Sequence, residues 1–463
     1  MKMDKQELFN KKETGWKNIS EENKENIFKF SDEYIYFLNK VKTEREAVHF
    51  VEKMLRENGF CCICEKENLV PGDKVYYINH DKSMYMAVIG KEPLENGLKV
   101  LGAHIDSPRL DLKPNPLYED TGFAYFKTHY YGGIKKYQWT TIPLAIHGVI
   151  VKANGEKIEV AIGEDENDPI FTITDLLPHL AQEQMEKKLK EGINGEDLNL
   201  LIGSIPEEDK DISEKIKLNI LMLLNEKYGM KEIDFVSSEL EIVPAFKARS
   251  LGFDRSMIAA YGQDDRVCAY TSVRAMLDVQ NPDKTAVCIL SDKEEIGSVG
   301  NTGMESEVFD YFMSELLNKK NENKPNALQK VYCHSKMLSA DVDAGLDPIY
   351  ASVSEKNNAA FIGYGIGMNK YTGGRGKSSA SDANAEYVAE VRKIFEEANI
   401  PYQVSELGKV DVGGGGTIAY ILANKGMDVI DCGVPVLSMH APYEVTSKFD
   451  VYCAYKAYST FVK

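Results

Sequence analysis

The sequence predicts an α/β fold with a central, mainly parallel sheet flanked by helices, and an inserted β-rich domain. From Ser250 onward, strand-like and helix-like runs alternate, which is typical of a parallel sheet with helices on its faces. In addition, several apolar, strand-like runs end in His, Asp or Glu. In an open α/β sheet, the carboxyl ends of the strands are where ligand sites form.

The first part of the chain carries local signals for a helix and a strand pair. Thr43 and Glu46 have the spacing of a capping box, which predicts a helix that runs to about Glu57. The runs 75–79 and 84–88 are strand-like and are separated by a short polar turn. They are therefore expected to pair as a hairpin.

The middle of the chain differs from the parts on either side. Aromatic residues crowd together after Pro108, and alternating runs follow at 145–151 and 157–162, as expected for strands with one buried face. A helix-like run occupies 216–228. Because 463 residues exceed what one hydrophobic core normally supports, we expect a catalytic domain split into 1–107 and 250–463, with residues 108–249 inserted.

Four strand-like runs end near a side chain that can bind a metal. The pairs of run and residue are 99–103 with His104, 286–290 with Glu294 and Glu295, 337–340 with Asp341, and 435–439 with His440. A further candidate, Asp264, precedes the helix-like run 267–279. Any one of these residues alone is more often structural, since buried His and Asp commonly satisfy hydrogen bonds. Together, imidazole and carboxylate ligands suit zinc, cobalt or manganese, and a site without thiolate is typical of catalysis.

Composition excludes several classes of protein. Hydrophobic residues make up 43% and charged residues 27% of the chain, which is typical of a globular protein. The net charge of −17 disfavours nucleic acid and anionic membrane surfaces as partners. The amino terminus lacks an apolar signal core, and no run approaches the ~20 apolar residues of a membrane-spanning helix. We therefore expect a cytoplasmic protein.

Five motifs follow one another along the chain: His104-Ile105-Asp106-Ser107-Pro108, Gln263-Asp264-Asp265-Arg266, Asp292-Lys293-Glu294-Glu295-Ile296-Gly297-Ser298, Ser339-Ala340-Asp341 and Ser438-Met439-His440. In this order they resemble the aspartyl aminopeptidase and aminopeptidase I family of dinuclear zinc exopeptidases. The resemblance extends from about Phe30 to Lys463. It implies two divalent metal ions, most often zinc, with cobalt or manganese as substitutes.

The resemblance also implies a role for each motif residue. Asp264 would bridge the two metals, with His104 and Asp341 on one metal and Glu295 and His440 on the other. Glu294 would be the general base, which takes a proton from the attacking water and passes it to the leaving amine. Asp106 would hold His104 in orientation from outside the ligand set.

Three further features are interpreted through the same resemblance. His129 lies in an aromatic, glycine-bearing segment of the insertion, where family members place a histidine that completes a neighbouring subunit's site. Lys377 lies in a glycine-rich loop that would line the pocket for the substrate's first side chain and could pair with an acidic one. The glycine run 413–416 is expected to pack closely beside the metal site, because glycine permits close backbone approach.

The function that follows is a metalloaminopeptidase that removes the N-terminal residue, either neutral or acidic, from short peptides. A dinuclear metal amidohydrolase acting on N-acyl amino acids would use nearly the same ligands. A non-enzymatic assembly protein that keeps the fold is the other alternative, although such a role often shows lost ligands and the whole set is intact here. The resemblance also implies a homo-oligomer in which the inserted domain joins dimers into a dodecamer.

Overall fold

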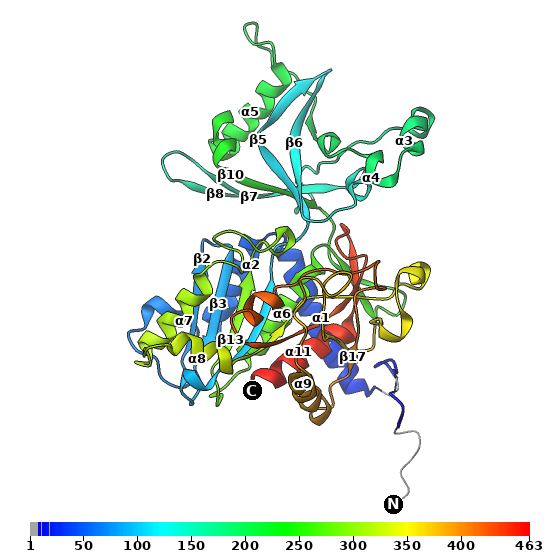
Figure 1. The fold of residues 1–463 in the computed structure, drawn as a ribbon. Coiled ribbons are helices and arrows are strands. Elements are labelled where there is room, and N and C mark those ends of the chain that lie inside the picture. Colours follow the sequence, from blue (N-terminus) through cyan, green and yellow to red (C-terminus); the bar gives the residue numbers. More distant parts are fainter. Residues whose placement is uncertain (1–7, 11, 18) are drawn as a thin grey trace, which may run out of the picture.

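The computed structural model describes residues 8–10, 12–17 and 19–463, and it has two lobes (Figure 1). One lobe surrounds a nine-stranded sheet, called the large sheet below. The other is built around a six-stranded sheet formed within residues 109–244 and is called the β lobe. Residues 1–7, 11 and 18 lie outside the described residues. The amino-terminal stretch that is expected to lack a signal core therefore falls outside them too.

The large sheet is mixed, and its central strands β13, β4, β14 and β18 are parallel to one another. The hairpin expected at 75–79 and 84–88 is confirmed as the antiparallel pair β2 and β3. In order across the sheet, the strands are β1 (Cys61–Cys62), β2 (Lys74–Asn79), β3 (Ser83–Val88), β13 (Ala286–Ser291), β4 (Lys99–His104), β14 (Lys336–Ser339), β18 (Asp428–Gly433), β16 (Ile366–Asn369) and β17 (Tyr402–Val404).

Successive side chains of the central strands enter two different cores. Leu101 and Cys288 belong to one core, whereas their neighbours Val100 and Val287 belong to the other. Strand side chains alternate between the faces of a sheet, so continuous apolar runs such as Ala286–Ser291 are what a sheet covered on both faces requires. The central strands are consequently buried along their length.

Helices cover both faces of the large sheet. The first core is closed by α1 (Glu21–Lys40), α2 (Glu44–Glu57), α6 (Gln263–Leu277), α9 (Ala385–Glu397) and α11 (Lys448–Val462). The second is closed by α7 (Val308–Lys319), α8 (Ala327–His334) and α10 (Ala419–Ala423). The predicted capping box is confirmed, because Thr43 and Glu46 exchange side-chain and backbone hydrogen bonds at the start of α2. Among the described residues, no helix has the length and apolarity needed to cross a membrane.

A smaller, five-stranded sheet lies within the same lobe as the large sheet. Its strands, in order, are β11 (Arg249–Leu251), β12 (Met257–Ala260), β20 (Glu444–Ser447), β19 (Pro435–Leu437) and β15 (Asp343–Ala344). The strand that precedes His440 therefore belongs to this small sheet and not to the large one.

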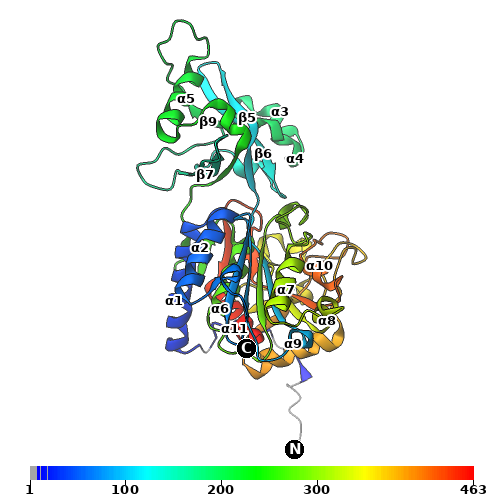
Figure 2. The ribbon, with the colours of Figure 1, turned by 90° about the vertical axis from the view of Figure 1, so that its left-hand side faces the viewer.

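The β lobe projects from one end of the other lobe in both views (Figures 1 and 2). Its core contains the fully buried Trp139. Its sheet has the order β8 (Lys157–Ile162), β7 (Leu144–Val151), β10 (Ser238–Pro244), β5 (Arg109–Asp120), β6 (Phe123–Tyr131) and β9 (Leu200–Gly203). Three helices accompany it, namely α3 (Gln182–Glu186), α4 (Leu189–Gly192) and α5 (Lys215–Tyr228).

Buried charged groups join the two lobes near the start of α2. Arg109 of β5 lies 3.5 Å from Glu44 of α2 and 3.2 Å from Glu241 of β10. His147 of β7 lies 2.7 Å from the capping residue Glu46. These contacts lie at the junction of the two lobes, where removing one partner of a buried pair is strongly destabilising.

Candidate metal centre

Three of the predicted ligand segments meet at one edge of the large sheet. His104 is the last residue of β4, and β4 lies between β13 and β14, parallel to both. Ser339 of β14 is in register with Gly102, which brings the following Asp341 to the level of His104. The chain leaving β13 makes the short 3-10 turn η8 (Glu294–Ile296). The edge formed by the carboxyl ends of these strands therefore collects the predicted ligands.

The other two predicted ligands come from different parts of the fold. Asp264 lies in the first turn of α6, where its backbone is non-helical. His440 lies in the loop after β19 of the small sheet. The expectation that all four ligand-bearing strands share the edge of one open sheet is therefore wrong for His440. Strand-like runs look alike in sequence whichever sheet they join, because sheet membership is decided by long-range pairing.

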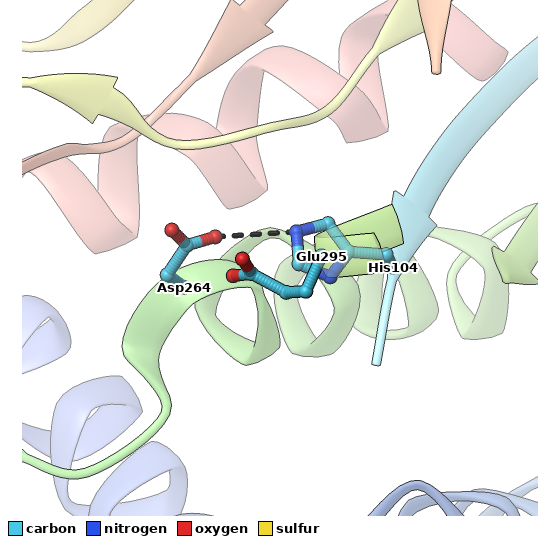
Figure 3. Close-up of side chains that lie close together, drawn as sticks. All are labelled: His104, Asp264 and Glu295. Carbon is cyan, nitrogen blue, oxygen red and sulfur yellow. Dashed lines mark ion pairs between the residues drawn. The ribbon is translucent and has the colours of Figure 1, made fainter. Parts of the chain in front are cut away.

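Asp264 directs one carboxylate oxygen toward each histidine. Its Oδ1 lies 3.2 Å from Nε2 of His104, and its Oδ2 lies 3.2 Å from Nε2 of His440. Oε1 of Glu295 lies 3.5 Å from the same His440 nitrogen. Figure 3 shows the side chains of His104, Asp264 and Glu295 converging from three segments of the chain. A carboxylate placed between two imidazoles in this way is suited to bridging two cations.

The donor groups are packed closely enough to share cations. Ligand atoms of His104, Asp264 and Glu295 lie within 4.8 Å of one another, and so do those of His104, Asp265 and Asp341. Oε1 of Glu295 is buried and has no hydrogen-bond partner among the described residues. Such an orphaned buried oxygen is costly unless a cation or donor satisfies it. Imidazole and carboxylate donors without thiolate match the ligands that catalytic zinc uses.

The shifted pKa values of the buried carboxylates are also those expected where a cation binds. Burial and the neighbouring Asp264 raise the pKa of Glu295 well above its ordinary value. Burial and the neighbouring Asp265 do the same to the pKa of Asp341. Burial opposes ionisation of Asp264 too, but His104 and His440 hold its pKa below the ordinary range. Several carboxylates buried together repel one another unless positive charge compensates them.

Glu294 lies beside the ligand cluster. Its Oε2 is 3.9 Å from Nε2 of His104, and its side chain lines a cavity of about 490 Å³ together with Glu295, Asp341 and His440. Burial raises the pKa of Glu294 to about 7, with Asp106 and Asp264 adding to the shift. A carboxylate at this place is positioned to accept and return a proton beside the ligand cluster.

Asp106 contacts His104 as the sequence led us to expect. Its Oδ1 lies 3.2 Å from Nδ1 of His104 and accepts the backbone N–H of Glu294, whereas its Oδ2 accepts the backbone N–H of Glu295. Burial would raise the pKa of Asp106, yet the hydrogen bonds from His104 and Tyr131 keep it below the ordinary value. Asp106 therefore contacts one histidine and the turn that carries both glutamates.

Sequence reasoning missed several groups that surround the site. Glu444 accepts the backbone N–H groups of Asp264 and His440, at 3.1 and 2.8 Å. Tyr131 donates to Asp106, and the carbonyl of Gly133 contacts Nδ1 of His440. Asp265, next to Asp264, joins one of the ligand groups. The acidic doublet was visible in the sequence, but the partners of Tyr131 and Glu444 lie far away along the chain.

Two predicted residues lie apart from the ligand cluster. Lys377 is exposed, pairs with Asp382 at 2.9 Å, and is not among the residues that line the ligand cavity. His129 is exposed on β6, where its ring contacts the carbonyl oxygen of Tyr130. Three members of the glycine run, Gly414 to Gly416, line the cavity, so the run lies beside the candidate site as expected.

Comparison with known proteins shows similarity along almost the whole chain. The family model described as aminopeptidase I zinc metalloprotease (M18) matches residues 37–462. A probable M18 family aminopeptidase 1 of Clostridium acetobutylicum is 54% identical, covering 98% of this chain and 99% of the relative. The crystal structure of an M18 aminopeptidase from Thermotoga maritima has a TM-score of 0.95 and 46% identity, covering 98% of this chain and 100% of the other. A more distant structure, the mApe1 dodecamer of S. cerevisiae, has a TM-score of 0.75 and 22% identity, covering 94% of this chain and 97% of the other.

Proposed function

The chain belongs to the aminopeptidase I zinc metalloprotease family (M18), and on that premise we propose that it removes the N-terminal residue from short peptides with two divalent metal ions, zinc foremost, and a glutamate base. The observation that carries the proposal is the placement of Asp264, with one oxygen 3.2 Å from each histidine. His104 and Asp341 would hold one metal and Glu295 and His440 the other, with Asp264 placed between the two pairs.

The proposed mechanism uses the chain's own groups around this centre. When bound, two zinc ions supply an activated water and a polarised substrate carbonyl. The carboxylate of Glu294 accepts a proton from the attacking water and returns it to the departing amine. Such general acid–base catalysis raises the rate by ~10²–10⁴-fold in typical enzymes. Asp106 supports this step, because it accepts the backbone N–H of Glu294 and so positions the turn that carries the base.

We propose a neutral or apolar N-terminal residue as the preferred substrate. Apolar side chains of the cavity include Met439, Leu407 and Val342, and neither Lys nor Arg is among its described lining residues. An acidic substrate side chain would enter a cavity that already contains several carboxylates, without a cation from the chain to pair with. Lys377 stays a candidate partner for acidic substrates, although its ion pair with Asp382 would have to open.

The deciding experiment compares kcat/KM of the zinc-loaded protein on peptides that differ only in an N-terminal Leu, Asp, Glu or Lys, with an acyl-blocked Leu peptide as control. The proposal expects Leu to be favoured and the blocked peptide to remain intact. Cleavage of the blocked peptide with free peptides left intact would instead support the amidohydrolase alternative. A tenfold preference for Asp or Glu, equivalent to about 1.4 kcal/mol, would move Lys377 into the substrate site.

We propose that residues 108–249 act as an inserted dimerisation and assembly domain of a homo-oligomer. Apolar side chains are exposed there, among them Leu180, Met185 and Leu189, which are 71%, 75% and 66% exposed. Exposed apolar groups of this kind are typical of protein interfaces. The exposed ring of His129 is proposed to reach a neighbouring subunit's site. A solution mass near twelve times 52.0 kDa is expected, as in the yeast dodecamer, and a stable monomer would contradict it.

A further inference from the structure

A short segment of the β lobe, Tyr131 to Gly133, contacts the candidate metal centre. The hydroxyl of Tyr131 donates a 2.8 Å hydrogen bond to Oδ2 of Asp106. The carbonyl oxygen of Gly133 lies 2.9 Å from Nδ1 of His440. The segment therefore contacts Nδ1 of His440 directly, and it contacts Nδ1 of His104 through the carboxylate of Asp106.

The hydrogen bond from Tyr131 completes the surroundings of Asp106. Three other groups approach this carboxylate, namely Nδ1 of His104 and the backbone N–H groups of Glu294 and Glu295, each at 3.2 Å. The contact from Tyr131 is the shortest of the four. Asp106 is fully buried, where hydrogen bonds to a charged acceptor are strong and a missing donor is costly.

Tyr131 itself is held by buried charge at the junction of the lobes. The guanidinium of Arg109 lies 4.0 Å from the centre of its ring, and the two residues are paired in register across β5 and β6. Arg109 is fixed in turn by Glu44 of α2 and Glu241 of β10. Burial and Asp106 raise the pKa of Tyr131, so its hydroxyl remains a donor at neutral pH.

We propose that Tyr131 is a positioning residue for the metal centre, which acts through Asp106 to orient His104 and the turn that carries Glu294 and Glu295. The inference rests on the metal roles given to those residues under the proposed function. It links the docking of the β lobe to the affinity of the centre for metal. The hydrogen-bond partners of metal-binding histidines typically change metal affinity by about 10–100-fold when they are removed.

The test measures zinc affinity of the metal-free protein by competition with a chromophoric chelator, so that its readout does not depend on turnover. Tyr131→Phe removes the hydroxyl that donates to Asp106 and keeps the ring that packs against the guanidinium of Arg109. Tyr130→Phe is the matched control, because Tyr130 is 44% exposed and precedes Tyr131 in the same strand. The expected result is a loss of about 10–100-fold in zinc affinity for Tyr131→Phe and no change for Tyr130→Phe.

A double-mutant cycle with Asp106→Asn separates positioning from a general structural effect. If Tyr131 acts through Asp106, the losses in zinc affinity for Tyr131→Phe and Asp106→Asn will not add in the double variant. Zinc affinity of Tyr131→Phe within twofold of the wild type, or fully additive losses, would overturn the proposal. Failure of the wild-type protein itself to bind zinc would instead remove the proposed function, and the two failures are thereby distinguished.

Discussion

Nδ1 of His440 lies 2.9 Å from the carbonyl oxygen of Gly133, although the two residues are 307 positions apart in the chain. A carbonyl oxygen only accepts hydrogen bonds, so Nδ1 must carry the proton and donate it. With Nδ1 committed to this bond, Nε2, which faces Asp264 and Glu295, is the nitrogen left to bind a metal. The carbonyl of Gly133 thus selects the tautomer of His440 that can bind a metal.

Glu294→Gln and Glu295→Gln form a matched pair, since they make the same change at adjacent positions. Glu294→Gln is expected to keep its zinc and lose turnover by ~10²–10⁴-fold, because the proton acceptor is removed. Glu295→Gln is expected to lose zinc, because its orphaned buried oxygen is a proposed ligand atom. Zinc content by elemental analysis and kcat on a Leu-peptide measure the two effects. Turnover retained by Glu294→Gln would remove this residue from the role of base.

Glu444→Gln is expected to destabilise the protein and weaken zinc binding. Both oxygens of Glu444 accept backbone N–H groups, one from Asp264 and one from His440. An amide has a single acceptor oxygen, so one buried N–H would face another donor, at a cost of about 1–3 kcal/mol. Thermal unfolding and chelator competition measure the two effects.

Val445→Thr is the control for this variant, because Val445 neighbours Glu444 on β20 and is only partly buried. Equal zinc affinities for Glu444→Gln and the wild type would contradict the predicted role of Glu444.

His147 lies between the carboxylates of Glu46 and Glu164, and this cluster predicts that the stability of the protein depends on pH. Burial lowers the pKa of His147, but Glu164 and Glu46 raise it to above its ordinary value overall. A raised folded pKa contributes stability that is complete below the unfolded value of about 6.5 and is lost as the pH rises through the folded value. We therefore expect the wild-type melting temperature to fall between pH 6 and pH 9 by more than that of His147→Gln.

The same cluster limits stability on the acid side. Burial would raise the pKa of Glu164, but His147 and Lys42 lower it to about 2. The contribution of Glu164 to the stability of the fold is therefore present above its unfolded pKa of about 4.3. It is lost as the pH falls toward 2. His147→Gln should cost about 1–3 kcal/mol near pH 6. His49→Gln, at a half-buried position of α2, is the control. If the melting temperatures of the wild type and His147→Gln change in the same way between pH 2 and pH 9, the predicted pH dependence of this cluster is contradicted.

Lys377→Ala tests the remaining candidate for acidic specificity. Its ammonium pairs with Asp382 and lies 3.7 Å from the centre of the Tyr371 ring, and it is outside the cavity lining. The ratio of kcat/KM for Leu and Asp peptides is therefore expected to stay within twofold of the wild type. Lys370→Ala, which removes the other lysine near Asp382, is the control. A tenfold rise of the ratio in Lys377→Ala alone would place Lys377 in the substrate site.

Features that depend on neighbouring residues were predicted from the sequence. The capping box of Thr43 and Glu46, the β2–β3 hairpin and strand β8, whose inner and outer residues alternate, all formed where their patterns indicated. Strand β7 formed too, but the alternation expected for it is wrong, because it is buried along most of its length. His104 and Asp341 also followed, because ends of parallel strands share one edge of a sheet. The identity of the family followed from the motifs that contain these residues.

What the sequence by itself determined was therefore several local elements of secondary structure, five candidate ligands and the family. Only the tertiary structure decided that His440 follows a strand of the small sheet and that Glu444 accepts the backbone N–H groups of two candidate ligands. It also decided that Tyr131 donates to Asp106. The physical reason is the separation, along the chain, of the residues that interact. Caps, turns and periodicity are set by residues a few positions apart, whereas strand pairing and buried hydrogen bonds join residues far apart in the chain and become fixed only when the lobes pack together.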